Sequence, residues 1–152
     1  MMSFKVFVSA AALTLLAASV ESSFSEGRDD FDYTLSGQEL TDLYNSRVKT
    51  IERMRRPMGS SSSGSGPISH SGVRVTLDDD SQWLIHKGDR YGRSSQTVVV
   101  EERFMSSKWK NIAPIVRCSG TKTVADLVDA GGAVYDVFSD NCHHASRRMN
   151  KC

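Results

Sequence analysis

The sequence predicts an α+β protein in which a small antiparallel sheet packs against helices. Two stretches, 70–77 and 82–87, alternate apolar and polar residues, as half-buried strands do. Stretches before and after them carry apolar residues three and four positions apart, which indicates amphipathic helices. With 152 residues, 39% of them hydrophobic, the chain can bury one modest core. Its formal net charge of +1 gives no indication of a nucleic-acid partner.

Residues 1–22 have the organisation of a secretory signal peptide. Lys5 precedes an apolar run from Val6 to Ala18, and small residues follow at the positions where cleavage is expected. The run is short for a bilayer span, and no second one follows. We therefore expect a secreted, extracellular protein that has no transmembrane anchor and is a monomer.

Residues 23–58 are expected to form an acidic segment followed by an amphipathic helix over 37–55. Ser36 and Glu39 have the spacing of a capping box, which marks the start of this helix. The apolar positions that then recur on one helical face are Leu40, Leu43, Tyr44, Val48 and Ile51.

The predicted helix ends in a cluster of basic residues, 53–56, directly before Pro57. Cations suit a helix C-terminus, but the same cluster resembles a dibasic processing site, which would make the helix a pro-segment. Residues 59–67 read GSSSSGSGP and have the composition of a flexible linker. We therefore expect the folded domain to span residues 68–152.

The two predicted strands can be aligned by their apolar residues. Pairing Leu77 with Ser81 gives an apolar face, because cross-strand partners share a face. That face carries Val73, Val75, Leu77, Trp83 and Ile85. His70 and His86 then lie together on the other face. A slip by one residue would break the apolar face and separate the two imidazoles.

Three further elements are expected downstream. The run 97–100 is typical of a buried strand, and 115–118 is a candidate for another short strand. Thr123 has the capping-box spacing to Asp126, so it begins a helix that the glycines at 131–132 terminate.

Cys142 opens the last predicted helix, in which Ala145 and Met149 lie on the same face. The positive end of a helix and any nearby imidazolium favour thiolate over thiol, so a cysteine in this position can serve as a nucleophile. The other interpretation is a small buried cysteine that merely begins a terminal helix. Next to Cys142, we expect Asn141, His143 and His144 to support the site without reacting themselves.

The chain has three cysteines, and an oxidising compartment favours a bridge between two of them. If Cys142 is the free one, Cys118 and Cys152 form the bridge. The alternative is that the odd thiol joins two chains. From the expected secretion and the odd count, we predict a Cys118–Cys152 disulfide with Cys142 free. A bridged sulfur at Cys142 could not attack a substrate.

Three motifs in a fixed order resemble the lecithin retinol acyltransferase-like branch of the permuted papain-like (NlpC-type) superfamily. They are a histidine that opens a strand (70–73), a histidine that ends the paired strand (84–86) and an Asn-Cys-x-His tetrad that opens a later helix (141–144). The resemblance covers residues 68–149 and implies the permuted papain-like fold.

The resemblance also implies roles for three residues. Cys142 would be the nucleophile, His70 the general base and His86 the group that orients this base. His143 and Ala145 depart from the family pattern, in which an acidic and an aromatic residue commonly stand at these places. This difference bears on the shape of the substrate pocket more than on the chemistry.

From these observations we expect a cysteine-dependent acyl hydrolase or acyltransferase that needs no cofactor and forms a thioester. Its substrate would be an acyl-bearing small molecule, a lipid or a peptide. One alternative is a secreted binding module of the same fold without turnover. Another is a zinc site made by Cys142, His70, His86 and one of His143 or His144. The adjacent histidines give poor chelating geometry, and no familiar Cys/His spacing is present.

Overall fold

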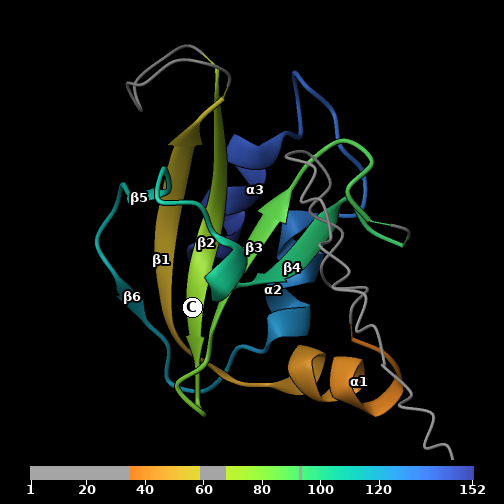
Figure 1. Cartoon of the computed structure of the whole chain (residues 1–152), viewed down its shortest axis with the longest axis vertical. Coiled ribbons are helices and arrows are strands. Elements are labelled where there is room, and N and C mark those ends of the chain that lie inside the picture. The colour runs from red at the N-terminus through yellow and green to blue at the C-terminus, as the bar shows by residue number, and fades with distance from the viewer. Residues whose placement is uncertain (1–34, 59–67, 93) are drawn as a thin grey trace, which may run out of the picture.

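The computed structural model describes residues 35–58, 68–92 and 94–152 (Figure 1). The expected signal peptide, the acidic segment up to residue 34 and the expected linker over 59–67 lie outside the described residues. The elements are α1 (Gly37–Asn45), β1 (Val48–Pro57), β2 (Ser69–Leu77), β3 (Gln82–Lys87), β4 (Thr97–Glu101), the short 3₁₀-helix η2 (Glu102–Phe104), β5 (Lys110–Asn111), β6 (Val116–Arg117), α2 (Val124–Gly131) and α3 (Cys142–Met149). This is an α+β structure with a small antiparallel sheet, as the sequence predicts.

The sheet has the strand order β4-β3-β2-β1-β5, and β6 also pairs with β1. All neighbouring strands are antiparallel. Val73 pairs with Ile85, and the N–H of Leu77 donates to the carbonyl of Ser81 at 2.9 Å. The register predicted from the apolar face is therefore confirmed, and it places His70 and His86 on the opposite face.

Each face of the sheet is covered by a different part of the chain. Figure 1 shows α2 and α3 behind the sheet, and η2 with its following loop in front. The core on the helical face consists of Leu43, Val48, Ile51, Val73, Val75, Leu77, Ile85, Val99, Val124, Leu127, Ala145 and Met149. The smaller core on the other face consists of Met54, Leu84, Val98, Val100 and Trp109.

The helix expected over 37–55 is wrong beyond Asn45. Helix α1 begins at Gly37 as predicted, although the side chain of Ser36 makes no capping hydrogen bond, and it ends at Asn45. The residues from Val48 onward form β1, the longest strand of the structure's described part.

The burial pattern of β1 explains why its sequence imitates a helix. Val48, Ile51, Met54 and Pro57 are buried, which is a spacing of three. A register shift between Val48 and Thr50 brings Val48 and Ile51 to the same side, in the core under the helices. Met54 lies in the core on the other face. A strand that has a bulge and is covered on both faces thus loses the alternation that identifies strands in a sequence.

The domain boundary expected at residue 68 is also wrong. Strand β1 pairs with β2 along its whole length, from Val48 with Leu77 to Pro57 with Ser69. It therefore belongs to the same sheet as the two histidines, and the folded unit includes residues upstream of the Gly/Ser stretch.

The elements predicted downstream are confirmed. Thr123 and Asp126 form the capping box of α2, and Gly132 follows its last residue with a positive φ of 90°. Cys118 and Cys152 form the disulfide, and Cys142 is a free, buried cysteine. Over the described ranges, no helix has both the length and the apolar character that a bilayer span requires.

Because β1 completes the core, we predict that Ile51→Ala will lower the free energy of unfolding by about 2–5 kcal/mol, since Ile51 is fully buried. The matched control is Lys49→Ala on the same strand, whose side chain is 48% exposed and forms a surface ion pair with Asp80; it should change the free energy of unfolding far less than Ile51→Ala does. Urea unfolding of the full chain measures both values. Equal, small losses would show that β1 does not contribute to the core.

Candidate active site

Cys142 is the first residue of α3, and the residue before it caps that helix. The side-chain oxygen of Asn141 accepts hydrogen bonds from the backbone N–H groups of His143 and His144, at 2.9 and 3.2 Å. The ring of His144 completes the cap, with Nδ1 2.9 Å from the same oxygen. Asn141 and His144 thus fix the start of α3, and Cys142 is only 4% exposed.

His70 and His86 form a buried pair on the neighbouring strands β2 and β3. Nε2 of His70 lies 2.7 Å from Nδ1 of His86, a hydrogen-bond distance. His86 stands opposite Gly72 in the register, and a Cβ at that glycine would lie 2.8 Å from the Cβ of His86. A glycine at position 72 therefore leaves the room that the His86 ring needs. The pair uses Nε2 of His70, so Nδ1 is the nitrogen left to exchange a proton with a substrate or a thiol.

Burial keeps the two imidazoles neutral. It lowers the pKa of His70 to about 3, and the positive charges of Arg56 and His143 act in the same direction. Burial, with contributions from His70 and Arg56, also lowers the pKa of His86 well below its ordinary value. At neutral pH, His70 is therefore an uncharged acceptor and not the imidazolium of a preformed ion pair.

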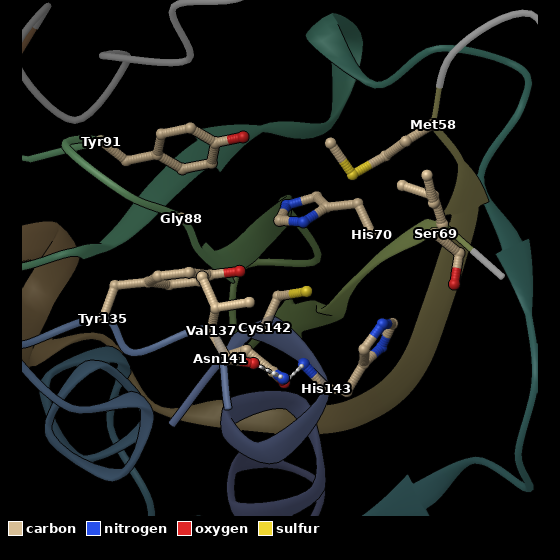
Figure 2. A pocket seen from close by; sticks show the side chains of 11 residues that line it. Met58, Ser69, His70, Gly88, Tyr91, Tyr135, Val137, Asn141, Cys142 and His143 are labelled. Atoms are coloured by element: carbon tan, nitrogen blue, oxygen red, sulfur yellow. Dashed lines mark hydrogen bonds between the residues drawn. The ribbon is translucent and has the colours of Figure 1, made fainter. Parts of the chain in front are cut away.

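One pocket of about 350 Å³ brings the candidate nucleophile and base together. Both Cys142 and His70 line it, whereas His86 is not among its lining residues. Figure 2 shows the sulfur of Cys142 pointing into the space beside the His70 ring, with Tyr91 and Tyr135 on one side and His143 and Ser69 on the other. The apolar lining residues are Met58, Ile68 and Val137.

Tyr135 is a neighbour of Cys142 that the sequence did not reveal. Burial raises the pKa of Tyr135, and its interaction with Cys142, which includes a side-chain hydrogen bond, raises it further. The phenol thus keeps its proton and donates it toward the sulfur. The sequence offers no clear signal for this contact, because Tyr135 stands in an irregular segment without apolar periodicity, seven positions before the cysteine.

His143 lies beside the pocket and is held by β2. Its Nδ1 is 2.7 Å from Oγ of Ser71, and its ring also has a hydrogen bond to the backbone of Ser69. His143 thus docks the first turn of α3 onto the strand that carries His70.

An ion-pair network joins the strand that carries His86 to the start of the helix that carries Cys142. The sequence did not predict this network. Nζ of Lys87, which is fully buried, lies 2.8 Å from Oδ2 of Asp140, and Arg148 approaches the other carboxylate oxygen at 2.7 Å. Burial acts to raise the pKa of Asp140, but hydrogen bonds and charges from Lys87 and Arg148 outweigh it, so the pKa is lowered. Lys87 follows His86 and Asp140 precedes Asn141, so adjacency to the candidate residues was the only signal available.

A zinc site would require at least three donors to converge. Among residues 35–58, 68–92 and 94–152, no group of three or more His, Cys, Asp and Glu side chains is arranged to hold a metal ion.

Comparisons of the chain with protein-family models, with curated proteins and with solved structures gave no match.

The neutral state of His70 generates a prediction for stability. Its pKa is about 3 in the folded protein and near 6.5 when unfolded. As the pH falls, residue 70 therefore takes up a proton in the unfolded chain before it does so in the folded protein. The contribution of neutral His70 to the free energy of unfolding is complete above pH 6.5 and is lost as the pH falls toward 3. Between pH 6 and 4.5, each unit of acidification should lower the free energy of unfolding of wild type by up to about 1.4 kcal/mol more than that of His70→Gln.

Urea unfolding at pH 7, 6, 5 and 4.5 measures these slopes. The control is Val73→Ala, which removes buried apolar atoms from the same strand and should lower stability without changing the slope. Parallel pH curves for wild type and His70→Gln would contradict a buried neutral histidine.

Proposed function

We propose that the protein is a secreted, cysteine-dependent acyl hydrolase or acyltransferase with a permuted papain-like fold of the lecithin retinol acyltransferase-like type. The observation that carries the proposal is the shared pocket: Cys142 begins a capped helix, and His70, paired with His86 at 2.7 Å, faces the same cavity. A nucleophile, a base and a group that orients the base are the parts that thiol catalysis requires.

In the first half of the reaction, the sulfur of Cys142 attacks the carbonyl carbon of the acyl donor. Its proton passes to Nδ1 of His70, and the carbonyl oxygen becomes an oxyanion. When the tetrahedral intermediate collapses, the bond to the leaving group breaks, the leaving group takes the proton from His70, and a thioester remains on Cys142.

Two donors are in position to stabilise the oxyanion. The backbone N–H of Cys142 is at the N-terminus of α3, where N–H groups have no intrahelical acceptor; without substrate it donates to the oxygen of Tyr135, and the oxyanion would replace that acceptor. The hydroxyl of Tyr135 is the second, because its hydrogen bond already reaches Cys142. Each such donor typically contributes a factor of about 10²–10³ to the rate.

In the second half, His70 accepts a proton from water or from an acceptor alcohol or amine, which attacks the thioester. The carbon–sulfur bond then breaks, and the sulfur regains its proton from His70. Water as the acceptor makes the protein a hydrolase, and any other acceptor makes it a transferase. His86 keeps the ring of His70 in position for both proton transfers.

The second candidate function is a binding module of the same fold without turnover. One observation favours it: the hydrogen bond of Cys142 runs to Tyr135, while the hydrogen bond of His70 runs to His86. In the catalytic account, the sulfur and His70 meet when a substrate enters, since catalytic hydrogen bonds are often long in the absence of substrate.

Hydrolysis of a p-nitrophenyl acyl ester by the full chain and its variants distinguishes these functions. We expect Cys142→Ser to abolish turnover and His70→Gln to lower its rate by about 10²–10⁴, the usual contribution of a general base. His86→Asn should leave an intermediate rate, because the base is still present but is less well oriented.

The control is Arg117→Gln, which changes an exposed side chain on β6 that is not among the residues lining the pocket, and it should retain the activity. A folded wild type that is no faster than Cys142→Ser would establish the binding module. A larger loss for His86→Asn than for His70→Gln would reverse the two histidine roles.

A further inference from the structure

A group of basic side chains lies between β1 and α3, next to the candidate active site. Arg55 pairs across β1 with Ser71 on one side and with Lys110 of β5 on the other, so these residues share a face of the sheet. Arg53 lies on the same face two positions earlier, and its Nε donates to Oγ of Ser146 in α3 at 3.2 Å. We call Arg53, Arg55 and Arg147 the cationic cluster.

The charges of the cationic cluster are close enough to oppose one another. Burial lowers the pKa of Arg53, and the charges of Arg147 and Arg55 lower it further. In the described part of the chain, the salt bridges of the other basic residues are those of Lys49, Arg74, Lys87, Arg103 and Arg148. The cationic cluster forms none with a described carboxylate.

One donor of the cationic cluster is also unsatisfied. Nε of Arg55 is buried and has no hydrogen-bond partner among the described residues. A buried donor without a partner is destabilising, so an acceptor that reaches this position from outside would be stabilising. Arg53 is held through Nε, and its two terminal nitrogens have no hydrogen bond to a described residue, so they can form a fork around an anion.

His143 connects the cationic cluster to the pocket. It lines the pocket together with Cys142, and it contacts Ser71, the cross-strand partner of Arg55. Burial lowers the pKa of His143, and the charges of Arg55, Arg147 and Arg53 lower it further, which shows how near these side chains are. Figure 2 places His143 on the side of the pocket away from Tyr91 and Tyr135.

We propose that the cationic cluster is a subsite for an anionic group of the acyl substrate, a carboxylate or a phosphate, that extends past His143 when the acyl carbonyl lies at Cys142. This inference rests on the proposed function, because it assigns the charge of the substrate used by that site. An anion there would offset the repulsion among the three guanidinium groups, and such groups bind both kinds of anion in bidentate geometry.

Matched alkylating reagents test the subsite without requiring turnover. Iodoacetyl-glycine and the neutral iodoacetyl-glycinamide differ by one carboxylate, and iodoacetyl-phosphoethanolamine and iodoacetyl-ethanolamine differ by one phosphate. The rate of Cys142 alkylation by each is divided by its rate with glutathione. At low salt, we expect at least one anionic reagent to exceed its neutral partner by about fivefold or more, and salt should reduce this preference.

The preference should disappear in Arg53→Gln and Arg147→Gln. It should persist in Arg117→Gln, which removes the same charge from β6, where Arg117 pairs with Thr50 toward the other end of β1. Whichever anionic reagent is preferred identifies the group. Rapid alkylation by all reagents with no charge preference, or a preference equal in all three variants, would overturn the subsite alone. Alkylation of Cys142 no faster than of glutathione by every reagent would overturn the subsite and count against the proposed function as well.

Discussion

The ion pair between Lys87 and Asp140 is the interaction on which the geometry of the site depends. Lys87 has no solvent exposure, so its ammonium requires a partner; removing the carboxylate of Asp140 would leave a buried charge uncompensated. The lysine follows His86 at the end of β3, and the carboxylate precedes the cap of α3. Arg148 binds the same carboxylate and donates to the carbonyls of Ala130 and Gly131 at the end of α2. One carboxylate therefore holds the histidine strand, the cysteine helix and α2 together.

The site is rich in positive charge, and this decides which charged species it favours. Burial lowers the pKa of His70 and of His143; Arg56 adds to the effect at His70, and the cationic cluster adds to it at His143. In the proposed reaction, His70 becomes an imidazolium only while it holds the proton of the thiol. The same positive charges would stabilise the negative oxygen of the proposed transition state and an anionic substrate. The proposed base and the proposed substrate charge thus depend on one electrostatic arrangement.

The sequence predicted the parts of the fold that local patterns encode. The register of β2 and β3 followed from Val73, Ile85 and their apolar neighbours, and so did the pairing of the histidines, because a shift by one residue reverses every side chain. It could not predict β1, since a bulge and burial on both faces produced a helical spacing. The contacts of Tyr135, Lys87 and the cationic cluster could not be predicted for a related reason. They join segments far apart in the chain, so no local sequence periodicity reflects them.

The central claim is that Cys142 accepts an acyl group with His70 as its base. The most direct measurement is peptide mapping by mass spectrometry after brief incubation of the full chain with a p-nitrophenyl acyl ester. The account predicts one acyl group on the peptide containing Cys142, sensitive to hydroxylamine as thioesters are, and strongly reduced in His70→Gln. A folded protein that acquires no acyl group on Cys142, or acquires it equally in wild type and His70→Gln, would contradict the account.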